Sequence, residues 1–336
     1  MMQSLYAECP QAECTGITLE FGFLSTESSG DPDGLIDAVS LASAVTVAPT
    51  LTSTPTLGAL LRTLVTEGET LLGAEHANSC LTFDGAGRLY VLNNQLGTVR
   101  IDLATEVQTR YTPPYPDLRA CSIVNGKACS PTPLNLPALP NDLAFDDAGN
   151  LYVSDSLQAT IWRVPAGGGT PQVWFQDARL ASAYVGVNGL RISPDRKRIF
   201  FTVTLDLLGI GHVYSLPLVD QPQKADLVEF HRYAVGGPDG IAFGASGKLY
   251  VVLALPGSSG LSILGADGRE TARIGNPLLT PLKPFDSPAN LAFDGQGNAL
   301  LTNHAFATGL LLPSHFQVLK VYVGDTASPL AGPVVP

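Results

Sequence analysis

The sequence NDLAFDDAGNLYV at residues 141–153 decides the fold, because related stretches recur along the chain. Residues 239–251 read DGIAFGASGKLYV, and residues 188–201 read NGLRISPDRKRIFF, with one extra residue in the turn. Two looser copies begin at Ser79 and Ala289. The starts at 79, 141, 188, 239 and 289 are separated by 62, 47, 51 and 50 residues. A period of about 50 residues, with two strands and a tight turn in each copy, predicts a β-propeller.

Each copy has the composition of a β-hairpin. In the first quoted copy, the apolar run at 143–145 predicts a short strand, and the Leu-Tyr-Val run at 151–153 predicts a second, buried one. Asp and Gly between the two runs supply turn chemistry, since Gly readily adopts positive φ. One hairpin cannot bury its faces alone, whereas blades packed around an axis can.

We therefore expect an all-β fold, a six-bladed β-propeller, built from the five visible repeats and strands of the N-terminal segment. Five and seven blades are the alternatives. Residues 75–336 would form the propeller, and residues 1–74 would contribute strands to the closing blade of a single domain. Six repeat residues should lie on core strands: Leu143, Phe145, Ile241, Phe243, Leu291 and Phe293.

The composition excludes some partners. Hydrophobic residues make up 45% and charged residues 15% of the 336 residues, which is enough apolar material for a large core. The net charge of −11 argues against a nucleic-acid partner. No uncharged apolar run reaches the roughly 18 residues of a transmembrane helix, so we expect no membrane partner. We expect a monomer that acts on a small molecule.

The cysteines suggest an oxidising compartment. Cys121 and Cys129 form one close pair and Cys9 and Cys14 another, which predicts two small disulfides and a free buried thiol at Cys80. The alternative is five reduced thiols in a cytosolic protein. We expect an extracellular or periplasmic protein, although the first six residues lack the basic start and apolar run of a signal peptide.

One position of the repeat carries candidate chemistry. The leading residues of the five copies are Ser79, Asn141, Asn188, Asp239 and Ala289. Equivalent positions lie on a ring around a propeller axis, and a residue just before the innermost strand lies at one mouth of the channel. Converging amide and carboxylate oxygens suit Ca²⁺ or another divalent cation. The alternative is that Asn and Asp begin these strands because they form Asx-turns.

Three stretches resemble the central motifs of the senescence-marker-protein/gluconolactonase/luciferin-regenerating-enzyme family. They are LPNDLAFD at 139–146, VNGLRISPD at 187–195 and GPDGIAF at 237–243, and the resemblance covers about residues 75–310. It implies a six-bladed propeller and, for many members, a lactonase that depends on Ca²⁺ or another divalent metal. Paraoxonases and strictosidine-synthase-like proteins are more distant relatives.

By this resemblance, Asn188 and Asp239 fall on metal ligands, and Asn141 falls on a residue that contacts metal, water or substrate. The family has a Glu ligand in its first repeat, where this chain has Ser79. Glu75 could reach the site if the preceding loop differs in register; otherwise Asn78 or water would complete the shell, and the affinity for metal should fall.

These residues suggest a divalent-metal-dependent hydrolase of a lactone or ester. The cation would polarise the carbonyl, Asp239 would be ligand and candidate base, and His304 or His76 would be further candidate bases. Four residues are expected to contact substrate: Glu75, His76, Ser79 and Asp142. Two alternatives stay open: a strictosidine-synthase-like enzyme or lyase on the same scaffold, and a non-enzymatic NHL-like propeller that binds a ligand.

Overall fold

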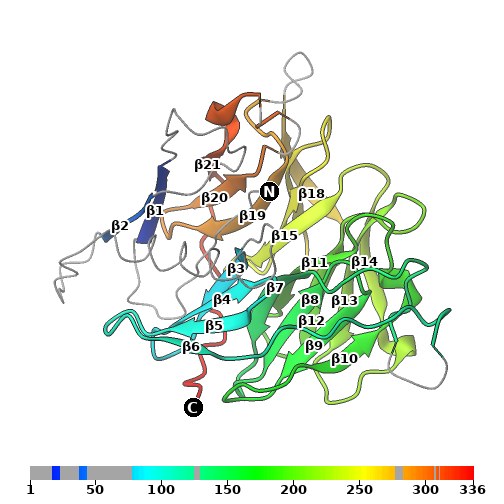
Figure 1. The fold of residues 1–336 in the computed structure, drawn as a ribbon. Coiled ribbons are helices and arrows are strands. Elements are labelled where there is room, and N and C mark those ends of the chain that lie inside the picture. Colours follow the sequence, from blue (N-terminus) through cyan, green and yellow to red (C-terminus); the bar gives the residue numbers. More distant parts are fainter. Residues whose placement is uncertain are drawn as a thin grey trace.

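The computed structural model describes residues 17–22, 38–43, 78–124, 129–276, 283–305, 308–309 and 311–336. These residues form an all-β propeller in which antiparallel sheets are arranged around a common axis (Figure 1). The described parts contain no α-helix, only the 3₁₀ turns η1 (Ala178–Leu180), η2 (Lys224–Asp226) and η3 (Pro313–His315). No described helix is long and apolar enough to cross a membrane.

Five sheets contain the repeated hairpins, and we number them blades 1 to 5 along the chain. Blade 1 contains β3 (Asn78–Phe83), β4 (Leu89–Asn93), β5 (Gly97–Ile101) and β6 (Gln108–Arg110). Blade 2 contains β7 (Pro140–Phe145), β8 (Leu151–Asp155), β9 (Thr160–Val164) and β10 (Gln172–Gln176). Blade 3 contains β11 (Val187–Ile192), β12 (Arg198–Val203), β13 (Gly211–Pro217) and β14 (Val228–Tyr233).

The other described strands form blades 4 and 5 and one further sheet. Blade 4 contains β15 (Pro238–Phe243), β16 (Leu249–Leu253), β17 (Gly260–Leu264) and β18 (Glu270–Gly275). Blade 5 contains β19 (Pro288–Phe293), β20 (Asn298–Asn303) and β21 (Gln317–Tyr322). A sixth, two-stranded sheet pairs β1 (Ile17–Gly22) with β2 (Ala38–Ser43), and β1 contacts β21 (Figure 1). The count of six antiparallel sheets is compatible with the expected six blades.

The repeats place the strands as expected. The first strands β3, β7, β11, β15 and β19 each begin one residue before the leading residue of a copy, with contacts between successive first strands at the axis. All six expected core residues lie on these strands. Leu143, Phe145, Ile241 and Leu291 are buried, whereas Phe243 and Phe293 are partly buried at the ends of their strands.

The hairpin turns of blades 1 and 2 share one set of hydrogen bonds. In blade 2, the Asp146 carboxylate accepts from the Asn150 amide at 2.8 Å and from the Tyr152 hydroxyl at 3.3 Å. Asp84 makes the same contacts with residues 88 and 90 of blade 1. In these two blades the turn Asp therefore ties the hairpin to the Tyr of its own second strand.

Blade 4 departs from this pattern because Gly244 occupies the Asp position. The carboxylate comes instead from Asp325, which accepts bonds from the Ser246 hydroxyl and, at 3.0 Å, from the Tyr250 hydroxyl. A Cβ on Gly244 would overlap this carboxylate. Asp325 begins a segment, 325–336, that we call the C-terminal strap.

The C-terminal strap crosses the ends of several blades that lie opposite the leading residues. Its carbonyl groups accept from Arg196 of blade 3 at 2.7 Å and from the Gly85 amide of blade 1 at 2.8 Å. Leu330 and Ala331 help to line a small cavity at this end of the channel, together with Arg191. The strap therefore covers the far end of the channel.

The cysteines follow the expectation where the structure describes them. Cys121 and Cys129 form a disulfide, and Cys80 is a free, buried thiol in β3. The long insertion that carries the disulfide docks on Gln158 of blade 2, whose side chain accepts from the Leu118 amide and donates to the Pro116 carbonyl at 3.0 Å. Cys9 and Cys14 lie outside the described residues.

Candidate functional site

Every first strand changes register at its leading residue. The pairing with the second strand shifts between Asn78/Cys80, Pro140/Leu143, Val187/Leu190, Pro238/Ile241 and Pro288/Asn290. Such a β-bulge leaves the extra residue unpaired and re-aims its side chain. The bulges therefore explain why these positions can carry side chains for the channel mouth instead of the sheet.

The two Asn leading residues are held by hydroxyl groups. Asn141 Nδ2 donates to Ser156 Oγ at 3.0 Å, and Ser156 Oγ donates to the Val187 carbonyl at 2.7 Å. In the next blade, Asn188 Nδ2 donates to Thr204 Oγ1 at 2.9 Å, and this hydroxyl donates to the carbonyl of residue 238 at 2.9 Å. Because each Nδ2 is engaged, each amide oxygen is directed to the other side of its side chain.

Asp239 supplies the carboxylate of this set. Part of the residue is accessible, and Asn188 hydrogen-bonds its side chain. Burial of the carboxyl group, followed by the negative charge of Asp142, raises the pKa of Asp239 well above its usual range. A bound cation would favour the ionised form against both effects.

His304 lies at the position in blade 5 that Ser156 and Thr204 hold in blades 2 and 3. Its amide donates to the Ser287 carbonyl, just as the amides of Ser156 and Thr204 donate to Leu139 and Gly186. By this equivalence, the His304 side chain neighbours the leading position of its own blade, which is Ala289. The small Ala289 side chain leaves room there for a half-buried imidazole.

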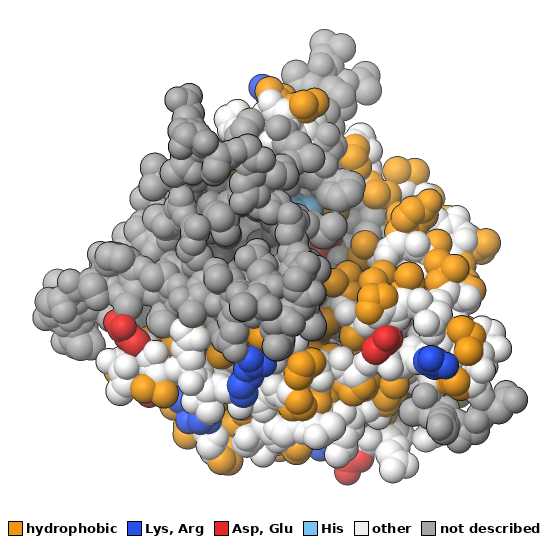
Figure 2. Space-filling view, in the orientation of Figure 1, with side chains coloured by type: hydrophobic (Ala, Val, Ile, Leu, Met, Phe, Trp, Pro, Cys, Tyr) orange, Lys and Arg blue, Asp and Glu red, His pale blue; other side chains and the backbone are white. Residues whose placement is uncertain are grey.

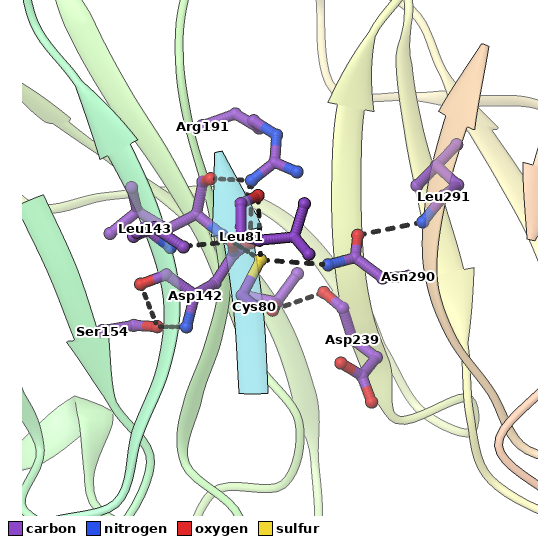
Figure 3. Close-up of polar contacts among 11 residues, drawn as sticks. Cys80, Leu81, Asp142, Leu143, Ser154, Arg191, Asp239, Asn290 and Leu291 are labelled. Atoms are coloured by element: carbon purple, nitrogen blue, oxygen red, sulfur yellow. Dashed lines mark hydrogen bonds and ion pairs between the residues drawn. The ribbon is translucent and has the colours of Figure 1, made fainter. Parts of the chain in front are cut away.

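A polar layer closes the channel below the leading residues (Figure 3). Cys80 Sγ donates to Asp142 at 2.9 Å and accepts from Asn290 Nδ2 at 3.9 Å. Asp142 also accepts a hydrogen bond from the Leu190 amide at 2.8 Å. Arg191 Nη1 donates to both carboxylate oxygens of Asp142, at 3.0 Å to Oδ1 and 2.9 Å to Oδ2. We call Cys80, Asp142, Arg191 and Asn290 the channel floor.

The charged residues of the channel floor are buried. Asp142 is 1% exposed and Arg191 5% exposed, so their ion pair is buried. Burial, and then the charge of Asp142, raises the pKa of the Cys80 thiol well above its usual range, so Cys80 stays protonated. In Figure 3, Arg191 and Asp239 lie on opposite sides of the layer formed by Cys80, Asp142 and Asn290.

Glycine at two positions lets the inner strands approach the axis. A Cβ on Gly189 would overlap the Asp239 carbonyl, and a Cβ on Gly240 would overlap the Asn290 side chain. The Gly residues that follow Asn188 and Asp239 are therefore required by the close approach of neighbouring strands.

The structure separates the expected site residues into groups. Asn141, Asn188 and Asp239 occupy equivalent positions on the bulges of three successive first strands. His304 follows the second strand of blade 5, at the position that Ser156 and Thr204 hold in blades 2 and 3. Asp142, expected to contact substrate, lies beneath them in the floor. Ser79 is buried, and its hydroxyl donates to the Pro140 carbonyl at 3.0 Å, so it links blades 1 and 2.

Two expected contacts, Glu75 and His76, lie outside the described residues. Sequence reasoning missed Arg191 and Asn290 and treated Cys80 only as a buried thiol. The signal that could have found Cys80 and Asn290 is the position after each leading residue, which reads Cys80, Asp142, Gly189, Gly240 and Asn290. Polar side chains at three of these five positions indicate a second ring below the first.

The donor set at the mouth fits a hard divalent cation. Two amide oxygens and one carboxylate are the ligand types that Ca²⁺ accepts, and a single carboxylate predicts modest affinity. Among the described residues, no group of three or more His, Cys, Asp or Glu could hold a metal. A metal at this mouth would therefore depend on the Asn side chains.

The face shown in Figure 2 carries few charges among its described residues. Lys, Arg, Asp and Glu side chains are isolated from one another, and hydrophobic side chains spread between them over the part where Figure 1 places blades 3 and 4. No continuous basic surface is visible on the described part of this face.

The fold and the bulges together define a β-propeller with Asn and Asp side chains at one repeated position of successive blades. The family model described as the SMP-30/gluconolactonase/LRE-like region matches residues 63–301. This match covers well over half of the chain, which therefore belongs to that family. A search of curated proteins finds no match.

Solved structures also match this chain. The calcium-binding protein regucalcin from Agrobacterium tumefaciens is 18% identical with a TM-score of 0.52, and the match covers 76% of this chain and 80% of that chain. A gluconolactonase from Xanthomonas campestris is 18% identical with a TM-score of 0.48, over 68% and 69% of the two chains. Virginiamycin B lyase from Staphylococcus aureus is 16% identical with a TM-score of 0.45, over 69% and 64%.

Proposed function

We propose that the protein is a divalent-cation-dependent hydrolase of a lactone or ester. The observation that carries this proposal is the ring of Asn141, Asn188 and Asp239, each on a β-bulge at the same channel mouth. Membership of the SMP-30/gluconolactonase/LRE-like family supports it. Among the solved structures, one is called a calcium-binding protein and another a gluconolactonase.

Asn141, Asn188 and Asp239 would hold the cation. When bound, it would polarise the substrate carbonyl and stabilise the negative charge that develops on its oxygen. Ser156 and Thr204 keep both Asn amides in one orientation, which is the role of outer hydrogen bonds in a metal site. We propose Ca²⁺ as the ion because all donors are oxygens.

His304 is the residue we propose as general base. It lies beside the leading position of blade 5, and a histidine titrates near neutral pH. It would take the proton of the attacking water and return it to the leaving oxygen. The channel floor lies below the reacting groups, so water and substrate would enter from the mouth alone.

The test is hydrolysis of a lactone and ester panel, measured with and without EDTA. The expected result is activity that EDTA abolishes and Ca²⁺ restores, with His304→Ala at least about 100-fold slower than the parent protein. His231→Ala is the matched control, because that histidine lies on β14 of blade 3 and hydrogen-bonds the Gly268 carbonyl of blade 4. Activity that is unchanged in EDTA would contradict the proposal.

The same experiment separates the alternatives. Hydrolysis in H₂¹⁸O places the label in the product acid, whereas a lyase gives an unsaturated product without label. A non-enzymatic propeller gives no turnover for any compound of the panel.

We also propose an exported, monomeric protein with a small-molecule substrate. The Cys121–Cys129 disulfide supports export, since such bonds persist in oxidising compartments. Mass measurement of the protein purified from culture medium and from cell extract, without reductant, tests this placement.

A further inference from the structure

We propose that the substrate carries an apolar hydrocarbon group next to its lactone or ester carbonyl, which binds to the loops beside the mouth. This inference rests on the proposed hydrolase function and adds the class of substrate. The loops concerned are residues 182–186 and 205–210 of blade 3 and residues 234–237 and 254–259 of blade 4, and we call them the mouth loops.

The mouth loops border the ring directly. Residues 182–186 lead into Asn188, and residues 234–237 lead into Asp239. Backbone bonds hold the loops in pairs: the Leu205 amide donates to the Val185 carbonyl at 3.0 Å, and the Leu255 amide donates to the Gly236 carbonyl at 3.2 Å. These loops therefore form a fixed rim beside two of the proposed ligands.

Large apolar side chains of this rim are exposed to solvent. Leu208 is 81%, Tyr184 74%, Val235 66% and Leu207 51% exposed. Beyond His304 in the sequence, Leu311 is 86% exposed. Most exposed apolar side chains of a monomer are scattered, whereas the first four belong to loops around one opening.

Charged groups are nearly absent from the same loops. The only charged residue in the mouth loops is Asp206. Its carboxylate accepts from the Leu208 amide at 2.8 Å and the Ile210 amide at 2.9 Å, and it contacts His212 at 3.2 Å. Those backbone bonds, together with His212, hold the pKa of Asp206 below its usual range although burial opposes the shift. Asp206 thus shapes its own loop and is already hydrogen-bonded.

Such a rim favours an apolar ligand over a polyhydroxylated one. A sugar lactone needs a donor or acceptor for each hydroxyl that it buries, because a buried hydroxyl without a partner is unfavourable. The exposed Leu, Val and Tyr side chains offer apolar area instead. Each methylene group of a ligand that this area removes from water raises the affinity about fourfold.

The experiment compares γ-lactones whose alkyl tails increase from methyl to octyl. We expect kcat/KM to rise with each added methylene in the parent protein and the increase to flatten in the double variant Tyr184→Ser, Leu208→Ser. Val334→Ser is the matched control, because Val334 is also 74% exposed but lies in the C-terminal strap on the far face. A preference for polyhydroxylated lactones, or no dependence on tail length, would overturn the inference.

A binding measurement separates this inference from the proposed function. The probes are 2-alkylcyclopentanones, which present a ring carbonyl and a tail but cannot be hydrolysed. If no lactone or ester is turned over, the hydrolase proposal fails, while tail-dependent calorimetric affinity that the double variant loses still supports an apolar ligand. Affinity that does not change with tail length overturns the inference.

Two other occupants of the rim are outcomes of the test. Sedimentation that shows a dimer in the parent protein and a monomer in the double variant would assign the rim to a second copy and overturn the inference. Binding to phosphatidylcholine vesicles that the double variant loses, without tail-dependent binding of the ketones, would overturn it as well.

Discussion

Asp142 is the residue on which the channel floor depends. Its carboxylate binds Cys80 of blade 1, and it binds the Leu190 amide and Arg191 of blade 3. Removing one partner of a buried ion pair leaves the other charge uncompensated. We expect Arg191→Leu to lower the free energy of unfolding by about 3–5 kcal/mol, measured by urea denaturation.

The control for this prediction is the double variant Arg191→Leu, Asp142→Asn. The amide introduced by the second change would be neutral and would keep an oxygen for the Leu190 N–H group, so we expect the double variant to recover part of the lost stability. Equal losses in the single and the double variant would show that packing of the Arg191 side chain, and not the charge pair, is responsible.

Asp239 should make stability depend on pH in the metal-free protein. Its pKa is raised in the folded state by burial and by Asp142, so the folded state binds the proton more tightly than the unfolded state. This contribution is complete below the usual pKa of an aspartate and is lost as the pH rises through the raised pKa. In EDTA we therefore expect Asp239→Asn to be more stable than the parent at neutral pH and similar to it near pH 3.

Thermal unfolding across this pH range measures the effect. Asn298→Ala is the matched control, since Asn298 is the hairpin amide that binds Asp294 in blade 5, far from the ring. A constant difference in melting temperature between Asp239→Asn and the parent at every pH would contradict the assignment.

The sequence predicted the ring residues better than the floor. Asn141, Asn188 and Asp239 share one position of the repeat, so the period alone brings them together. Arg191 was not predicted, because its ion pair with Asp142 joins two neighbouring blades and the sequence of a single repeat does not reveal such a contact. Ser79 reads as a lost ligand in the sequence, whereas its hydroxyl links two blades.

The hairpin of blade 4 holds the C-terminal strap through the Asp325 carboxylate. Asp325 provides blade 4 with the carboxylate that Asp84 and Asp146 provide within blades 1 and 2. Asp325→Ala would leave the Tyr250 and Ser246 hydroxyls without this acceptor. We expect a loss of about 2–3 kcal/mol in the free energy of unfolding, because bonds to charged groups are the stronger ones.

A second change should rescue this variant. In the parent, Gly244→Asp is expected to be destabilising, since any side chain there would overlap Asp325. Combined with Asp325→Ala, it would restore the arrangement of blades 1 and 2, so the double variant should be more stable than either single one. The strap would then be released from blade 4, and limited proteolysis near residue 325 should be faster. Additive losses would contradict this account of the hairpin.

At the level of elements, period and turn chemistry predicted the first two strands of every described blade. The bulges were not predictable from composition, because a bulge is an extra residue in the pairing of two strands and not a residue type. The strap was also missed, since its sequence has no hairpin pattern and its contacts are with hairpin ends far away in the sequence, such as Arg196 of blade 3.

The arrangement of the blades around one axis predicts that changes at the channel mouth alter the stability of the whole molecule. Asn141, Asn188 and Asp239 come from blades 2, 3 and 4, and the first strands of these blades contact one another. The sequence predicted the propeller because each repeat needs neighbours to bury its faces. It did not settle how the ring closes, because β1 and β2 belong to no visible repeat.

A cation that binds three blades together should stabilise the whole molecule. It would bind the folded ring and not the unfolded chain, in which the three residues are far apart in sequence. We expect Ca²⁺ at about 100 times its dissociation constant to raise the free energy of unfolding by about 2.7 kcal/mol. Thermal unfolding in a Ca²⁺ titration measures this gain, with Mg²⁺ as a parallel series.

The variants decide whether the gain comes from the ring. Asp239→Asn should abolish it, because the only carboxylate among the three leading residues is lost, and Asn188→Ala should reduce it. Asn298→Ala should keep the full gain, since that amide belongs to a hairpin at the other end of blade 5. A melting temperature that stays constant up to millimolar Ca²⁺ in the parent would mean that the ring holds no cation, and His304 would then have to act on a substrate bound without one.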